Sequence, residues 1–441
     1  MGTKRAVILL FLISLVLSAC DLLNNAEIGN PDALTTPVTA TLEATSVAPQ
    51  NTPDFEVPVT VTPAAAALKL WIPPEIALRT EMGAQLLAEQ LFAFNAKHPT
   101  VVIHVEQKDV SGAGGILNYL RTGRGVAPSV LPDMIAIPAD LLPTAANENL
   151  IFPLDDALEP TALDSLFPPA QELARPEERI LGYPFALTDL PYMVYNSHAL
   201  TSTLPLTWNR LISDTERSMV MASGGPDGAL LALQFYLDAG GTVVNELGEP
   251  ALQMEPLELA LKALQNGRDS GFIVEQSSSS STLDQSWQVF LGGGANIVRT
   301  SADYYLSETT VGLPIEFTVT PGIDRPLTPF VGGWAWAIST SDPVQQALAQ
   351  ELMLELVAAP NLGAWSQSSN MLPAQRDALA AWIGDDAYSG FVEQELGRAQ
   401  PLPVDPNSKL FTVIGDAVFQ VVSGSKTAEG AAEDAVAAMQ S

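Results

Sequence analysis

The stretch LKLWIPPEIALRTEMGAQLLAEQLFAFNAKHPTVVIHVEQ, Leu68–Gln107, predicts how the folded body of this chain begins. LKLWI is typical of a strand and stops at two prolines, and apolar side chains then recur at helical spacing from Met82 to Phe94. Pro99 ends that helix, because a residue before proline disfavours helical backbone angles. VVIHVEQ is rich in β-branched residues and predicts a second strand. A strand, a helix and a strand in this order indicate a βαβ unit, and hence a parallel sheet with right-handed crossovers.

The same alternation continues to the C-terminus, so we expect an α/β fold. Further strands are predicted in PDMIAIP, GYPFAL, MVYN, SMVMAS, ANIVRTS and PFVGGWAWAIS. Further helices are predicted in ALLALQFYLDAGG, PLELALKALQNGRDSG, DPVQQALAQELMLELVAA and residues 409–422, and the serine run 277–281 is expected to be an exposed loop. The body is longer than the roughly 250–300 residues at which one core stops growing, which predicts two lobes.

The N-terminus, KRAVILLFLISLVLSAC (Lys4–Cys20), has the parts of a secretory signal peptide. Two positive charges precede an apolar run shorter than the roughly 20 residues that cross a membrane, and small residues follow it. Leu17-Ser18-Ala19-Cys20 resembles the lipobox of bacterial lipoproteins, which implies a lipidated Cys20 and anchorage by acyl chains. The alternatives are a plain signal peptide, or an uncleaved anchor with an incidental cysteine.

Residues 21–67 are rich in proline and threonine and keep neither helical nor strand periodicity. Such a composition buries too little apolar surface to order itself, so we expect a disordered tether between the membrane and the body.

Composition argues against several classes of function. The formal net charge of −30 disfavours nucleic-acid binding, which needs clustered Lys and Arg. The single Cys excludes an intrachain disulfide, and three scattered His residues predict no metal site. No nucleophile elbow, phosphate loop or zinc-protease motif occurs, so we expect neither an enzyme nor a cofactor.

From about Leu68 to Met439, the order of short motifs resembles the family 1 extracellular solute-binding proteins, the lipid-anchored receptors of ABC importers, of the maltose-binding type. The resemblance rests on LKLWIPPE, FNAKHPTVVIHVE, PDMIAIPADLLPTAANENLIFPLDDAL, GYPFALTDLPYMVYNSHAL, PLTWNRLI, LDAGGTVV, WQVFLGGGANIV, FVGGWAWAIS and MLPAQRDAL. The chain departs from the family at Gly294-Ala295-Asn296-Ile297, where the usual lysine is missing, and in a short early segment. Both departures concern the ligand and leave the fold untouched.

The resemblance implies a two-lobed periplasmic-binding-protein fold, in which each lobe is a mainly parallel sheet flanked by helices and the ligand cleft lies between the lobes. We expect lobe 1 in residues 68–187 and 331–370, lobe 2 in residues 188–330, and a C-terminal helical segment, residues 371–441, mostly on lobe 2. The implied function is a monomeric, extracytoplasmic receptor that is anchored to the membrane by lipid and hands its solute to an ABC permease.

Candidate ligand residues follow the predicted strands, because ligands of open α/β sheets bind beyond the carboxyl ends of strands. Trp71 and Glu75 follow the first strand, where the alternatives are a core tryptophan and a solvated charge. The resemblance aligns Glu75 and Asp140 with ligand-binding carboxylates, although Asp140 also suits a helix N-cap.

The predicted crossovers between the lobes supply the remaining candidates. Thr188 and Asp189 lie at the first crossover, and a polar-aromatic tip, Thr300 to Tyr304, follows a later strand. The candidates in this tip are Ser301 and Tyr304. Trp334 and Trp336 face the same side of the second crossover strand, so both line the cleft or both are core, and we favour Trp334 at the cleft. Phe411 aligns loosely with another aromatic ligand residue.

Aromatic rings beside carboxylates suit a carbohydrate, which is the first interpretation. A polyamine-like cation is the second, because rings and carboxylates also hold positive charge. A ligand sensor for a signalling partner and a secreted glycoside hydrolase using Glu75 and Asp140 remain as alternatives.

Overall fold

The computed structural model describes residues 66–159, 161–308, 312–384 and 386–440. The predicted signal peptide, Cys20 and nearly all of the predicted tether lie outside these described residues. None of the helices in the described part of the chain is long and apolar enough to cross a membrane.

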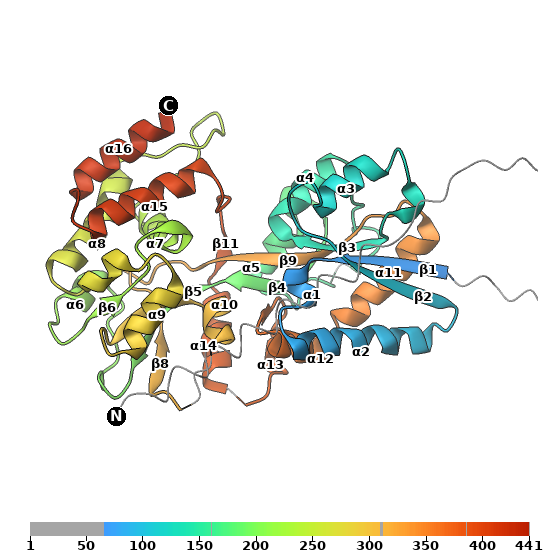
Figure 1. The fold of residues 1–441 in the computed structure, drawn as a ribbon, viewed down its shortest axis with the longest axis horizontal. Helices are drawn as coiled ribbons and strands as arrows, with labels where there is room; N and C mark the ends of the chain where they lie inside the picture. Colours follow the sequence, from blue (N-terminus) through green and yellow to red (C-terminus); the bar gives the residue numbers. More distant parts are fainter. Residues whose placement is uncertain (1–65, 160, 309–311, 385, 441) are drawn as a thin grey trace, which may run out of the picture. The chain divides into compact units, whose positions relative to one another are not determined.

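The first lobe is built on a seven-stranded sheet (Figure 1). The strand order is β10-β4-β9-β3-β1-β2, with β11 beside β9. The strands are β1 (Ala66–Ile72), β2 (Val101–Gln107), β3 (Met134–Pro138), β4 (Tyr183–Asp189), β9 (Phe330–Ile338), β10 (Leu372–Pro373) and β11 (Gln400–Pro401). Strands β1 and β2 pair in parallel, which confirms the predicted βαβ unit, whereas β9 runs antiparallel to β3 and β4.

Helices cover both faces of this sheet because successive side chains of its strands point to opposite sides. Leu70 shares an apolar cluster with residues of α2, α11 and α12, and Trp71 shares another with residues of α3 and α4. Figure 1 shows these two groups of helices on opposite sides of the sheet. The helices of the first lobe are α1 (Pro74–Ala77), α2 (Glu81–Lys97), α3 (Ile116–Gly123), α4 (Leu142–Asn147), α5 (Pro168–Ala174), α11 (Pro343–Leu356), α12 (Ala359–Ser368) and α13 (Arg376–Ala380).

The second lobe is built on a four-stranded sheet of order β6-β7-β5-β8. Its strands are β5 (Pro191–Asn196), β6 (Met219–Val220), β7 (Ile297–Ser301) and β8 (Ile315–Thr318). Its helices are α6 (Trp208–Ile212), α7 (Gly225–Asp238), α8 (Met254–Asp269), α9 (Leu283–Leu291), α10 (Ala302–Ser307), α14 (Asp386–Leu396), α15 (Lys409–Val422) and α16 (Ala428–Gln440). The side chains of α7, α8, α15 and α16 share one apolar core with one face of the sheet.

The chain crosses between the sheets where β4 ends and β5 begins. Asp189 and Leu190 both have positive φ there, 68° and 50°, a region that side-chain-bearing residues rarely occupy. The N–H of Leu190 donates to the carbonyl of Phe330, the first residue of β9, at 3.3 Å. The two predicted crossovers, at the end of β4 and the start of β9, are therefore hydrogen-bonded to each other where the lobes meet.

The limits of the predicted lobes need adjustment. β1 begins at Ala66, so the strand takes two residues that were assigned to the tether. β10 and α13, within the predicted C-terminal helical segment, belong to the first lobe, because β10 pairs with β4. α14 lies against the second sheet, where the hydroxyls of Tyr388 and Tyr192 are 3.1 Å apart.

The prediction of an exposed loop at the serine run was only partly right, because Ser279 and Ser281 are exposed but the run begins in a 3-10 helix, Glu275–Ser279. Ser277 and Ser280 are buried, with 0% and 3% of their surface exposed. Met221 donates its N–H to the Ser277 hydroxyl at 3.2 Å, and Ser223 donates its N–H to the Ser280 carbonyl at 2.8 Å. The run supports the segment between β6 and α7, because its polar groups bond the backbone that leaves the strand.

Candidate functional site

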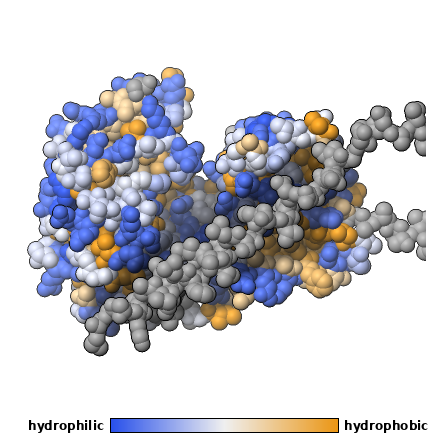
Figure 2. Space-filling model, in the orientation of Figure 1, coloured by the Kyte–Doolittle hydropathy of each residue, from blue (hydrophilic) through white to orange (hydrophobic). Residues whose placement is uncertain are grey.

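A cavity of about 600 Å³ lies at the edge of the first sheet where β3 and β4 end. This is the size range of sites that enclose small molecules. Figure 2 shows the molecule hollowed between α4 of the first lobe and α15 of the second. The lining residues are Pro138, Asp140, Leu141, Thr144, Leu173, Thr188, Asp189, Val331, Gly332, Gly333, Trp334 and residues 402–406.

The two tryptophans of β9 have different environments. Trp334 is half-buried and forms part of the cavity wall. Trp336 has only 3% of its surface exposed and stacks on Phe185, with the ring centroids 4.7 Å apart. The predicted site residue Trp336 is therefore a core residue, and the expectation that the pair shares one environment was wrong.

Thr188, Asp189 and Gly332 form the floor of the cavity. The hydroxyl of Thr188 donates to a carboxyl oxygen of Asp189 at 3.3 Å. A Cβ at position 332 would lie 2.6 Å from the Thr188 hydroxyl and 3.3 Å from the Asp189 carboxyl, so glycine leaves room for both. Burial raises the pKa of Asp189, while hydrogen bonds from Thr188 and the Gly332 backbone oppose that rise. The floor offers a desolvated carboxyl group to whatever enters.

Asp140 lies in a 3-10 turn, Ala139–Leu141, and its exposed side chain lines the cavity. It is not the N-cap of α4 that the sequence also suited, because that position is Leu141. Desolvation of its carboxyl raises the pKa, and the charge of Asp405 adds to the rise, whereas backbone N–H groups of Asp140 and Leu141 lower it. Two carboxyl groups from distant parts of the chain thus influence each other at the cavity.

Trp71 and Glu75 do not line this cavity. Trp71 has 4% of its surface exposed and packs in the apolar cluster beside α3. The ammonium of Lys108 lies 5.3 Å from its ring centroid, and Tyr119 meets the ring edge-on at 6.0 Å. Glu75 is an exposed residue of α1. The carboxylate pair required for the hydrolase interpretation, Glu75 and Asp140, is therefore not brought together in the cavity.

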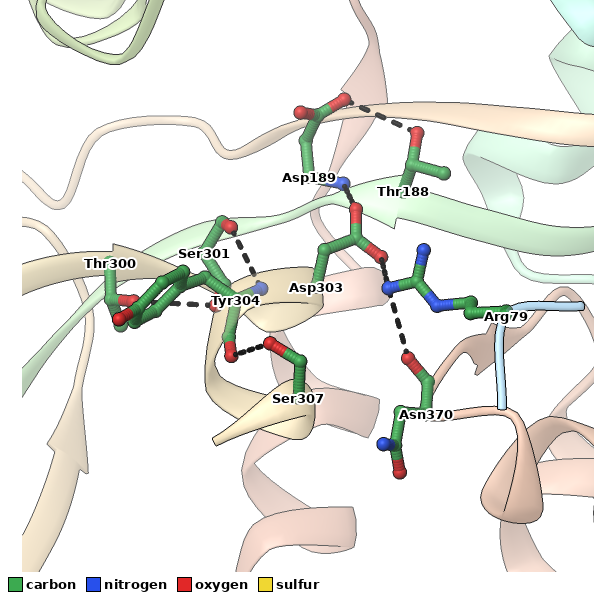
Figure 3. Close-up of polar contacts among 9 residues, drawn as sticks. All are labelled: Arg79, Thr188, Asp189, Thr300, Ser301, Asp303, Tyr304, Ser307 and Asn370. Atoms are coloured by element: carbon green, nitrogen blue, oxygen red, sulfur yellow. Dashed lines mark hydrogen bonds and ion pairs between the residues drawn. The ribbon is translucent and has the colours of Figure 1, made fainter. Parts of the chain in front are cut away.

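Three further predicted residues also lie away from the cavity. Ser301 caps α10 by accepting the N–H of Tyr304 (Figure 3). The hydroxyl of Tyr304 donates to Asp284 at 3.2 Å, and desolvation together with neighbouring carboxylates raises the pKa of Tyr304. Phe411 has 3% of its surface exposed and belongs to the apolar core of the second lobe.

The segment Leu402–Pro406 is the part of the site that sequence reasoning missed. It connects β11 to α15 and supplies Leu402, Pro403, Val404, Asp405 and Pro406 to the cavity. The signal for it was present in QPLPVDPNS, since three prolines directly before a predicted helix favour a stiff, extended connection. Without knowledge of β11, nothing in the sequence related this connection to Trp334.

The second lobe adds polar groups near the floor. Desolvation raises the pKa of Asp227, in the first turn of α7, while the charge of Arg299 opposes that rise and the charge of Asp189 adds to it. Arg299 has 3% of its surface exposed, and it donates to the Asp227 carbonyl at 3.1 Å and to Gln234 at 2.9 Å. Burial lowers the pKa of Arg299 to about 10, and the charge of Asp227 opposes that effect.

The cavity combines an aromatic wall, carboxyl groups and apolar loop residues. A tryptophan can stack on the apolar face of a sugar ring, and carboxylates accept hydrogen bonds from its hydroxyls. Within the described ranges, no group of three or more His, Cys, Asp or Glu side chains is arranged to hold a metal ion.

Comparison with known proteins gives the class of the molecule. Residues 90–389, more than half of the chain, match the family model described as bacterial extracellular solute-binding protein. The chain belongs to this family, which places it outside the cytoplasm and gives it the role of binding a solute. A comparison with curated proteins found no match.

Solved structures of the same architecture support the two-lobed fold. The sugar-binding protein MalE from Xanthomonas citri is 16% identical, with a TM-score of 0.68 over 84% of this chain and 96% of its own. The GacH receptor of Streptomyces glaucescens is 16% identical, with a TM-score of 0.63 over 85% of this chain and 98% of its own. MalE from Listeria monocytogenes is 17% identical, with a TM-score of 0.64 over 85% of this chain and 97% of its own.

Proposed function

We propose that this solute-binding protein captures a carbohydrate in the cavity beside Trp334. The observation that carries the proposal is the position of a half-buried indole next to Asp140, Asp189 and Asp405 in one cavity of about 600 Å³. Similar structures support it, since GacH was solved with acarbose and the Listeria monocytogenes protein with maltose. Trp334 would stack on the ring, and the carboxylates would orient its hydroxyls.

We also propose how the receptor is anchored and where its solute goes. Lipidation of Cys20 would hold a monomeric protein on the outer side of the membrane, and an ABC permease would receive the sugar. The protein would bind its solute without converting it, because its family consists of solute-binding proteins and Glu75 and Asp140 do not face a common substrate.

A polyamine-like cation is the second candidate ligand. Three of the lining residues carry carboxyl groups, Asp140, Asp189 and Asp405, and neither Lys nor Arg is among the residues that line the cavity. The excess of carboxyl groups favours a positively charged ligand, and the indole of Trp334 can also contact a cation.

Calorimetric titration of the purified full-length chain separates the candidates. The panel is maltose, maltotriose, acarbose, spermidine and putrescine, and each is also recovered after a long incubation to test for conversion. Saturable binding of a sugar that is recovered intact, and that is weakened in Trp334→Ala, supports the carbohydrate receptor. Binding of the amines alone would replace the ligand class, and conversion of a sugar would contradict a pure binding role. Trp382→Ala is the matched control, because Trp382 is also partly buried and lies outside the cavity lining.

A further inference from the structure

Figure 3 shows a polar network in which Asp303 of α10 lies between residues of the first lobe and the crossover. Arg79, between α1 and α2, donates to one carboxyl oxygen of Asp303 at 3.3 Å. The same guanidinium donates to the carbonyl of Asn370, between α12 and β10, at 3.3 Å. The other carboxyl oxygen of Asp303 accepts the N–H of Asp189 at 2.7 Å.

We propose that Arg79 and Asp303 form a tie between the two lobes that holds the crossover at Asp189 and thereby positions the floor of the solute cavity. Arg79 and Asn370 lie in connections between elements of the first lobe, whereas Asp303 follows β7 of the second sheet. The ion pair therefore joins segments whose relative position must change if the lobes move. Both residues are positioning residues, since neither lines the cavity.

Asp189 connects this tie to the cavity. Its backbone N–H bonds Asp303, while its carboxyl group lines the cavity floor. Its positive φ is uncommon for a residue with a side chain, and such a conformation persists only where neighbouring groups hold it. Next to it, Ala302 donates its N–H to the carbonyl of Leu190 at 3.2 Å, which fixes α10 against the same turn. A shift of α10 would therefore move Asp189 directly.

The environment of the pair makes it more effective than an exposed pair. About a quarter of each side chain is exposed, 26% for Arg79 and 26% for Asp303, so solvent screens the interaction less than at an open surface. Desolvation and the charge of Asp189 raise the pKa of Asp303 to about 6, and the charge of Arg79 and the Asp189 N–H oppose the rise. The consequence for solute affinity rests on the proposed function, but the tie itself is independent of which solute binds.

Hydrogen exchange of the full-length chain, measured by mass spectrometry without any sugar, tests the tie. Arg79→Met and Asp303→Asn should each speed exchange in peptides that cover residues 187–192 by about two- to fivefold, the effect of losing a pair worth up to about 1 kcal/mol. The side-chain amide introduced by Asp303→Asn can still accept the Asp189 N–H, so Asp303→Ala should speed exchange further. The double variant Arg79→Met/Asp303→Asn should show less than the combined single effects, because both substitutions remove the same ion pair, although Arg79→Met also removes the bond to the Asn370 carbonyl.

Arg121→Met is the matched control. Arg121 pairs with Glu148 at 2.6 Å within the first lobe, and its loss should leave the peptides over 187–192 unchanged. Three results would each overturn the tie. They are wild-type exchange over residues 187–192 in both single variants, fully additive effects in the double variant, and an equal effect of Arg121→Met. Since no sugar is present, these outcomes are separate from a failure of the carbohydrate assignment.

Discussion

Trp334 and Trp336 lie two residues apart on β9, and only Trp334 lines the cavity. Trp336 stacks on Phe185 in the core, whereas Trp334 follows Gly332 and Gly333, where the strand lies close to the crossover. Two residues of β9 that are next to each other on one face of the strand therefore have different roles, one in the cavity wall and one in the core.

The substitution Trp334→Ala should weaken maltose binding by about tenfold or more, which corresponds to a loss of roughly 1.4 kcal/mol. The reason is loss of the stacking surface in the cavity. Trp336→Ala should instead lower the free energy of unfolding by about 3–5 kcal/mol, because it empties a core position. Calorimetric titration and urea unfolding measure the two effects. If both variants lost the same affinity for maltose under conditions where both are folded, the assignment of Trp334 to the cavity would be contradicted.

Gly332→Ala should disturb the cavity floor. The added methyl would lie 2.6 Å from the Thr188 hydroxyl, closer than non-bonded atoms approach, so Thr188 and Asp189 must shift. We expect weaker sugar binding and a loss of about 1–3 kcal/mol of stability, the usual result of overfilling a packed site. The matched control is Gly390→Ala in α14, where a Cβ meets no atom within 4 Å and a helix gains stability from alanine. Wild-type affinity in Gly332→Ala would show that the floor does not contact the solute.

Asp303 should make stability depend on pH. Its folded pKa of about 6 lies above the ordinary value of 3.8, so the folded state binds the proton more tightly than the unfolded state. This group therefore stabilises the fold below about pH 4 relative to pH 7, and the contribution is lost as pH rises through about 6. Asp303→Asn lacks this dependence. The stability of the variant relative to wild type should increase by about 1–3 kcal/mol between pH 4 and pH 7, as measured by urea unfolding. A constant difference across this range would argue against the raised pKa.

Asp405→Asn should lower the pKa of Asp140. Removing the charge of Asp405 removes one cause that disfavours ionised Asp140, although desolvation, the larger cause, remains. A carbon-13 NMR titration of the Asp140 carboxyl measures the shift. Asp342→Asn is the control, because Asp342 caps α11 away from the cavity and asparagine serves equally as a cap. An unchanged Asp140 titration in Asp405→Asn would place the two carboxyls too far apart to share a ligand.

Cys20→Ser should release the protein from membranes. The predicted lipidation site has no substitute in the chain, because Cys20 is the only cysteine. Membrane fractionation and labelling with a radioactive fatty acid measure the loss. Ser18→Ala keeps a small residue at its position and should retain both the label and the membrane association. Persistence of the label in Cys20→Ser would disprove lipidation at this residue.

Much of the fold was predictable because it follows from local patterns. The period of the apolar residues, the breaks at Pro99 and Gly240, and the β-branched runs are properties of short segments, and they placed β1, α2, β2, α8 and α15 correctly. The short strands β10 and β11 were missed, since two residues carry no periodicity and their pairing with β4 and β9 depends on distant parts of the chain.

The site was less predictable than the fold. Asp140, Thr188, Asp189 and Trp334 were expected at the cavity and line it. Position after a strand was not enough for Trp71, and a loose alignment with the family was not enough for Phe411, because large rings also fill cores. Arg79 showed no signal at all, since its partner is 224 residues away.

The connection Leu402–Pro406 has a consequence for how this receptor can diversify. It contributes five lining residues to the cavity, yet it lies outside every helix and strand and between two elements that are fixed on their own, β11 by β9 and α15 by α7. Leu402 and Val404 pack against the core of the second lobe, so new side chains can enter at the exposed positions Pro403, Asp405 and Pro406 while both lobes keep their packing. The chain can therefore acquire a different solute preference through changes in one short loop, and a designer who wants a new biosensor should begin with that loop.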